Sequence, residues 1–207
     1  NIYAMTPTSG DLSTANGKDP WGYLNTAIER CNNIIEGIEE YGDTTTTKMK
    51  YLLGEAYFLR SFCYLQLVQL WGDVPARFVS ISKDENGLNT KKSDRTDVLK
   101  QLRIDLKKAA LLMPWSNGCP GTAANYTGRP SKGAAYALLA RVDLMYAGKG
   151  VRPATWKNGP EFLVEEADLR RELNTEVMWA CAQIINNGNE AGKFQTNYED
   201  IFKKICA

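Results

Sequence analysis

Carboxylates, thiols and aromatic rings are the groups that could carry chemistry in this sequence, which contains no histidine. Histidine is the most frequent general base and metal ligand, so its absence argues against acid–base and metal-dependent catalysis. The carboxylate pairs at 39–40 and 165–166 are adjacent on predicted helices, where neighbouring side chains diverge by about 100°. Such pairs cannot flank one glycosidic bond, as a glycosidase requires. We therefore expect no catalytic residue and no enzymatic activity.

The five cysteines do not indicate a metal site or a disulfide framework. They are scattered, odd in number and form no Cys-x-x-Cys pair, which a zinc site or a disulfide-rich domain would show. Cys31, Cys63 and Cys181 fall on the predicted inward faces of helices, where a cysteine usually acts as a small hydrophobic residue. No glycine pattern resembles a phosphate-binding loop. We expect neither a metal nor a cofactor.

Aromatic residues in predicted loops are the remaining candidates for a binding site. Aromatic faces stack on the apolar C–H patches of sugars, while nearby amide and charged groups bond the hydroxyls. The rings that stand near Asn or Asp are Tyr3, Trp21, Trp115, Tyr126 and Trp156. The alternative is that Trp21 packs the start of its helix and that Trp115 and Trp156 anchor their loops.

The stretch 54–71 predicts the central helix that positions these loops. Its apolar residues recur every three or four positions on two rows, one of which includes Trp71. Because this helix is apolar on most of its circumference, we expect other elements to surround it. Glu55 and Arg60 lie within it, and each is expected to pair with a neighbouring helix or loop, since a buried charge must be satisfied. Gly72 is typical of a helix end.

Other helices are predicted on both sides of the central one. Asp19-Pro20 indicates a helix start, with Asp as N-cap and Pro in the first position. Further helices are expected after Asp94, after Ser131 and over about 165–187. The motif Gly-x-Ala-Tyr-x-Leu occurs at 54–59 and again at 133–138, which is typical of stacked helical hairpins. The predicted fold is all-α, with tetratricopeptide-like hairpins side by side and long irregular loops.

A single helical-repeat region is expected over residues 1–207. It divides into a loop at 1–19, a first hairpin at 20–75, a second at 94–148 and the start of a third at 161–207. The net charge of +1 and the lack of a basic stripe argue against nucleic-acid binding. No stretch approaches the roughly 18 to 20 apolar residues that span a bilayer.

Several ordered motifs resemble the N-terminal half of the SusD/RagB family. They extend over most of residues 21–202 and are Asn32-Asn33-Ile34-Ile35, the run from Gly54 to Tyr64, Trp71-Gly72-Asp73-Val74-Pro75, the run from Gly128 to Val142, and the segment from Phe194 to Phe202. The resemblance implies an outer-membrane lipoprotein on the extracellular face of Bacteroidetes-type bacteria. Since the family's anchoring N-terminal cysteine is missing and the resemblance stops near the family's midpoint, we expect a fragment that is incomplete at both ends.

The resemblance further implies a function, a partner and a site. Such proteins bind oligosaccharides without catalysis, for uptake through a SusC-like TonB-dependent transporter. Contact with the membrane is expected only through a lipid anchor. The family's glycan platforms draw on the stretch before the first repeat helix, which favours Trp21 and Tyr3, with Asn16 and Asn25 as hydrogen-bonding neighbours. The alternatives are a peptide-binding subunit of the RagB type and a pure protein-interaction scaffold.

Overall fold

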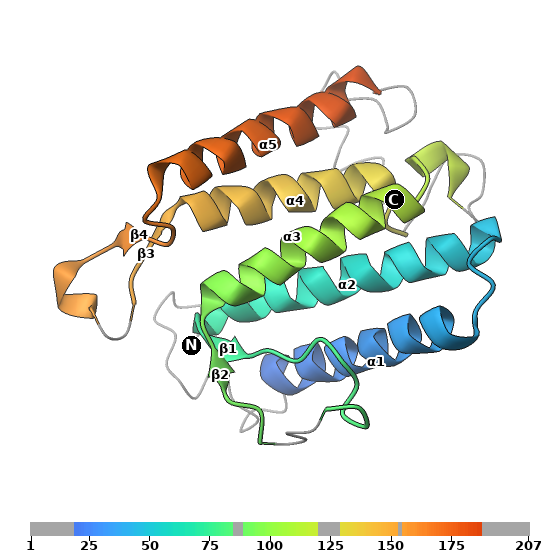
Figure 1. The fold of residues 1–207 in the computed structure, drawn as a ribbon, viewed down its shortest axis with the longest axis horizontal. Helices are drawn as coiled ribbons and strands as arrows, with labels where there is room; N and C mark the ends of the chain where they lie inside the picture. Colours follow the sequence, from blue (N-terminus) through green and yellow to red (C-terminus); the bar gives the residue numbers. More distant parts are fainter. Residues whose placement is uncertain (1–18, 85–88, 120–128, 153–154, 188–207) are drawn as a thin grey trace, which may run out of the picture.

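The computed structural model describes residues 19–84, 89–119, 129–152 and 155–187, which form five α-helices with short connecting elements (Figure 1). The helices are α1 (Pro20–Tyr41), α2 (Thr47–Trp71), α3 (Arg95–Leu112), α4 (Lys132–Ala147) and α5 (Ala167–Asn186). Two 3₁₀ turns, η5 (Ser116–Gly118) and η6 (Trp156–Asn158), lie in the connections. The predicted all-α fold is confirmed.

Each helix packs mainly against the helices before and after it in the chain, so that α1 to α5 form an antiparallel series. Helices α1, α3 and α5 thereby flank α2 and α4. Two small antiparallel ladders lie at one end of the bundle (Figure 1). One pairs β1 (Val74–Pro75) with β2 (Lys92–Ser93), and the other pairs β3 (Lys149–Gly150) with β4 (Glu161–Phe162). The ladders follow α2 and α4 and lead the chain toward α3 and α5.

Side-chain caps begin four of the five helices. The predicted start at Asp19-Pro20 is confirmed, because an Asp19 carboxylate oxygen accepts a hydrogen bond from the Gly22 amide at 2.9 Å. Thr46, Asp94 and Ser131 cap α2, α3 and α4 in the same manner. Satisfying the free N–H groups of a first turn stabilises a helix by about 1 kcal/mol.

The hydrophobic core surrounds α2, as its sequence predicts. Twelve of its residues are buried, whereas α5 buries only Leu173 and Ala180. The predicted inward position of Cys181 is wrong: its side chain is exposed, since Ala180 occupies the buried face of α5 at that level. Cys31 and Cys63 are buried as predicted. None of the helices that the structure describes has the length and apolar composition of a membrane span.

Candidate functional site

Trp21, the first ring favoured by the sequence, pairs with Trp71 at the end of the bundle that carries the ladders. Because α1 begins where α2 ends, the two indoles meet edge to face, with ring centroids 5.1 Å apart and an interplanar angle of 76°. Both rings are half-buried and pack against the main hydrophobic core. Trp21 therefore has a packing role, and part of its ring remains open to solvent.

Asn25 follows Trp21 one turn later on α1 and is half-buried. Its side-chain amide donates a hydrogen bond to the Trp21 backbone carbonyl, one turn earlier on the helix, at 2.9 Å. Tyr23 lies on the same turn with 69% of its surface exposed. Beside Trp71, the Asp73 carboxylate accepts bonds from the Arg95 backbone amide and guanidinium. This end of the bundle thus combines aromatic surface with amide and charged groups.

The other predicted binding residues have different outcomes. Tyr3, Asn16 and Tyr126 lie outside the described residues, as does the segment 194–202. Trp115 contacts Tyr136 with ring centroids 6.0 Å apart, and the Lys132 ammonium lies 5.8 Å from its ring, which agrees with loop anchoring.

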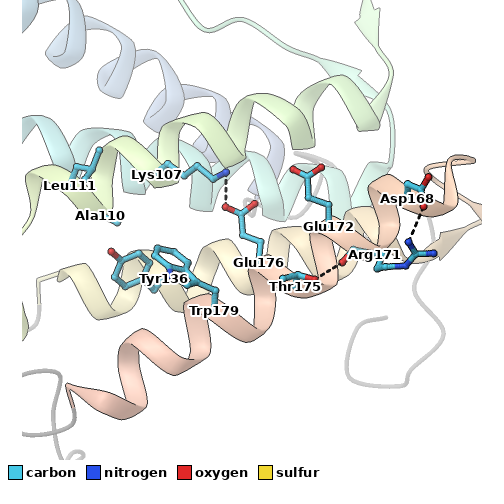
Figure 2. Close-up of a pocket in the computed structure, with 10 residues that line it drawn as sticks. All are labelled: Lys107, Ala110, Leu111, Tyr136, Asp168, Arg171, Glu172, Thr175, Glu176 and Trp179. Atoms are coloured by element: carbon cyan, nitrogen blue, oxygen red, sulfur yellow. Dashed lines mark hydrogen bonds and ion pairs between the residues drawn. The ribbon is translucent and has the colours of Figure 1, made fainter.

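A groove of about 740 Å³ runs between α3 and α5 across α4 (Figure 2). At one end, the Tyr136 and Trp179 rings meet edge to face at 5.3 Å, and Trp179 is 48% exposed. Ala110 and Leu111 extend this apolar surface along α3. The α5 side of the groove is polar and is lined by Asp168, Arg171, Glu172, Thr175 and Glu176.

Ion pairs between α3 and α5 hold the groove together. Glu176 bridges the Lys107 ammonium and the Arg103 guanidinium, each at 2.5 Å. Burial alone would raise the pKa of Glu176, but hydrogen bonds from these two cations hold it below its ordinary value. Asp168 pairs with Arg171 at 3.0 Å. Among the described residues, Glu172 forms no hydrogen bond or ion pair, so its carboxylate is available to a ligand.

The charges inside the first hairpin have structural roles. The Arg60 guanidinium bonds Asp105 on α3 at 2.7 Å and Asn32 on α1 at 2.9 Å. Glu55 pairs with Arg129 near the start of α4. The expectation that each of these charges has a neighbouring partner is confirmed. The arrangement leaves them no free group for acid–base chemistry.

Two aromatic surfaces therefore result from the fold, and sequence reasoning located only one of them. Trp71 was assigned to a core row because its helical spacing matched one, and Trp179 lies in a helix, outside the loops that the search for aromatic rings covered. The repeat motif at 133–138 was a signal for Tyr136, because it contains that residue. In the described part of the chain, both surfaces combine aromatic rings with hydrogen-bonding groups, which is the chemistry of binding surfaces.

Comparison with known proteins identifies a family model over residues 12–144, which describes starch-binding proteins associating with the outer membrane. Solved structures include a SusD superfamily protein from Parabacteroides distasonis, with 23% identity and a TM-score of 0.67 over 88% of this chain. A SusD homologue from Bacteroides thetaiotaomicron is 25% identical, with a TM-score of 0.66 over 90% of this chain. A laminarin-binding SusD-like protein is 20% identical, with a TM-score of 0.62 over 89% of this chain. No curated protein sequence matches.

The chain spans about a third of the length of these solved structures, since the shares of their chains that it covers are 34%, 32% and 34% respectively. The similarity therefore concerns the helical part that this sequence contains.

Proposed function

Because the chain belongs to the SusD-like family of starch-binding proteins that associate with the outer membrane, we propose that it binds oligosaccharide without catalysis. The family match over residues 12–144 is the observation that carries this proposal. Solved relatives support it, since one binds laminarin and another was crystallised with a xylogluco-oligosaccharide. Binding needs aromatic faces and hydrogen-bonding groups but no catalytic acid.

The ligand surface that we propose lies at the indole pair of Trp21 and Trp71. The half-buried Trp21 ring offers apolar surface to a sugar, and Asn25, one turn later on the same face of α1, supplies an amide group. Tyr3 and Asn16, which lie outside the described residues, complete the proposed site. The Trp21–Trp71 contact supports this surface by fixing the ring orientation before a ligand arrives.

We propose that the protein acts at the extracellular face of the outer membrane, as a lipoprotein that delivers its ligand to a SusC-like TonB-dependent transporter. The family description supports the membrane association, and the transporter is an expectation from family resemblance. We also propose that residues 1–207 form one helical-repeat region with the hairpins expected from the sequence. The stacked helices then serve as a scaffold, and their ends carry the ligand.

Affinity electrophoresis of this chain in gels that contain starch, laminarin or xyloglucan tests the proposal. We expect at least one polysaccharide to retard migration, and Trp21→Ala to weaken that binding by about 1–3 kcal/mol, the contribution of an aromatic stacking contact. If none of the three polysaccharides retards the migration of the chain, that result would argue against glycan binding by this part of the family fold.

The control is Trp179→Ala, which removes an equally large ring from the remote groove between α3 and α5. We expect it to leave polysaccharide retention unchanged. Thermal unfolding of the Trp21→Ala variant separates the two roles of this residue. A lower melting temperature with unchanged retention would assign Trp21 to the core alone.

A further inference from the structure

The connection between α4 and α5 forms a cavity that has no part in the surface proposed above. Its volume is about 530 Å³, which lies within the range of small-molecule sites. The lining comes from the segment after β3, from β4 and from the start of α5: Arg152, Glu161, Phe162, Leu163, Glu165 and Arg170. Because two arginines and two glutamates line the cavity, their charges balance. Such a lining favours an uncharged ligand that both donates and accepts hydrogen bonds.

The Arg170 guanidinium is held in place and still has open donors. Its Nη1 donates hydrogen bonds to the backbone carbonyls of Val164 at 2.7 Å and Glu165 at 2.6 Å. In the described part of the chain, its Nε and Nη2 form no hydrogen bond or ion pair. Arginine presents its N–H groups in a planar fork. This side chain can therefore donate to neighbouring hydroxyl groups of a ligand with little further loss of conformational freedom.

An open acceptor lies on the same lining. Glu165 is exposed, and no residue that the structure describes donates a hydrogen bond to its carboxylate. The Glu161 carboxylate, in contrast, accepts bonds from Thr155 at 3.0 Å and Asn158 at 3.2 Å, which tie η6 to β4. The cavity therefore offers one free carboxylate together with the free donors of Arg170. Sugar hydroxyls match this combination, because each hydroxyl donates one hydrogen bond and accepts others.

Phe162 adds apolar surface beside these polar groups. It is 43% exposed. The Arg170 Cζ lies 4.1 Å from the centroid of its ring, and the Lys149 ammonium lies 4.6 Å from it. These two cations orient the ring, and its exposed part can contact the apolar C–H patch of a sugar.

The cavity lies at the same end of the bundle as the indole pair, and Arg95 connects the two regions (Figure 1). The Arg95 guanidinium pairs at 2.9 Å with Asp73, which stands two residues after Trp71. The same guanidinium approaches β3, since a Cβ atom on Gly150 would lie 3.6 Å from its Nη1. Arg152, two residues after Gly150, lines the cavity. The side chain of a single arginine thus extends from the turn after α2 to the strand that leads into the cavity.

We propose that this cavity is a second carbohydrate subsite, which binds a further neutral sugar residue of an oligosaccharide held at Trp21. Arg170 and Glu165 bond neighbouring hydroxyl groups of that sugar, and Phe162 contacts its apolar face. Because both surfaces then hold one ligand, the cavity raises the affinity for long oligosaccharides more than for short ones. This inference rests on the proposed function, since it requires an oligosaccharide at the indole pair.

Isothermal titration calorimetry of the 207-residue chain with maltohexaose, laminarihexaose and a xyloglucan heptasaccharide tests the proposal. Variants are compared on each ligand that the wild type binds. We expect Phe162→Ala to weaken binding at least tenfold, because it removes the apolar contact. Glu165→Gln is expected to weaken binding at least threefold, because a neutral amide accepts hydrogen bonds less strongly than a carboxylate. Both variants are also expected to reduce the preference for a hexasaccharide over the corresponding trisaccharide, an effect that loss of stability alone would not produce.

Val151→Ala and Glu166→Gln are the matched controls. Val151 is 48% exposed on the same connection, Glu166 follows Glu165, and both lie outside the described lining of the cavity. We expect both variants to bind as tightly as the wild type does.

Far-ultraviolet circular dichroism verifies that each variant is folded, and Glu165→Gln decides the question if Phe162→Ala does not fold. A wild type that binds none of the three oligosaccharides would overturn the proposed function together with this inference. Binding by the wild type that the folded variants retain at equal strength would overturn this inference alone.

Discussion

Arg60 shows what a single buried residue does in this fold. Its guanidinium contacts α1, α3 and the segment after β1, while its own backbone belongs to α2. Burial raises the pKa of its partner Asp105, although Arg60 opposes that effect. A buried ion pair of this kind is costly to break, because removal of one partner leaves the other charge without compensation. Arg60 thus connects four segments whose relative positions it helps to fix.

Asp143 on α4 is a buried titratable residue of the second hairpin. Its carboxylate lies 2.6 Å from the Arg103 guanidinium, and the side chain is fully buried. Burial raises the pKa of Asp143 to about 7, even with Arg103 beside it. The folded protein therefore retains a proton on this carboxyl group at pH values where the unfolded chain has released it.

This retained proton predicts a pH dependence of stability. Between the ordinary pKa of an aspartate and about 7, the folded state binds more protons than the unfolded state, so the free energy of unfolding falls as pH rises. The slope is at most about 1.4 kcal/mol per pH unit. Urea unfolding of the wild type and Asp143→Asn at pH 4.5 and pH 7.5 measures it. We expect the wild type to lose stability relative to the variant as pH rises.

Comparison with the variant isolates this effect. Carboxylates whose pKa is lowered in the folded state, such as Asp73 and Asp94, contribute the opposite slope, and both proteins contain them. A stability difference that is the same at both pH values would contradict the prediction.

At the scale of elements, the approach of α2 to α3 depends on Gly54. A Cβ atom at this position would lie 2.7 Å from Met113 Cγ, 3.0 Å from Leu112 Cβ and 3.3 Å from the Ala109 carbonyl oxygen. The Met113 side chain can move, but the other two atoms are attached to the backbone of α3 and its end. The repeated glycine therefore permits close helix packing at this crossing.

Gly54→Ala is expected to destabilise the protein by about 1–2 kcal/mol. Overpacking costs about 1–3 kcal/mol, and the better helix propensity of alanine offsets up to about 1 kcal/mol of it. Gly37→Ala on α1 is the matched control, because its Cβ would meet nothing within 4 Å. We expect that variant to be more stable by about 0.5–1 kcal/mol. Urea unfolding of both variants measures the difference, and equal effects would refute the packing argument.

The elements themselves could be predicted from local signals. Asp19, Asp94 and Ser131 marked helix starts because a cap involves only the first turn, and the structure confirms all three. The contacts between elements could not be predicted in the same way. Arg60 was expected to have a partner, but Asn32 and Asp105 are 28 and 45 positions away, and no local pattern selects them.

The binding surfaces illustrate the same limit. Trp21 was found because it is an aromatic residue near Asn and Asp, in the stretch that the family resemblance favours, while its partner Trp71 was assigned to an apolar row of the central helix. Trp179 and Cys181 could not be placed correctly, because the exposed side of α5 depends on how that helix lies against α4. Periodicity gives a helix its apolar face, and packing decides which part of that face is covered.

At the scale of the whole molecule, stability is expected to be uneven. Each helix packs mainly on its neighbours in the series, so the central helices share contacts that an outer helix lacks. The first outer helix, α1, is further fixed by residues 76–80, while α5 buries only two residues in the described part of the chain. Local opening should therefore begin at α5.

Amide hydrogen exchange of the 207-residue chain tests this expectation. We expect backbone amides in α2 and α3 to exchange most slowly and those in α5 to exchange at least tenfold faster than those in α2, because few buried apolar contacts oppose local unfolding. Peptides from α1 and α4 are expected to lie between these limits. Uniform protection across all five helices would mean that the molecule opens only as one unit.

Both β-ladders lie at the same end of the bundle as the Trp21–Trp71 contact. The loops between β1 and β2, and between β3 and β4, can therefore become longer or shorter while the paired ladder residues still hold the two ends of each loop together. Selection for new ligands can act on the tips of these loops and leave the helix interfaces unchanged. The architecture thus separates the residues under pressure to vary from those under pressure to stay the same.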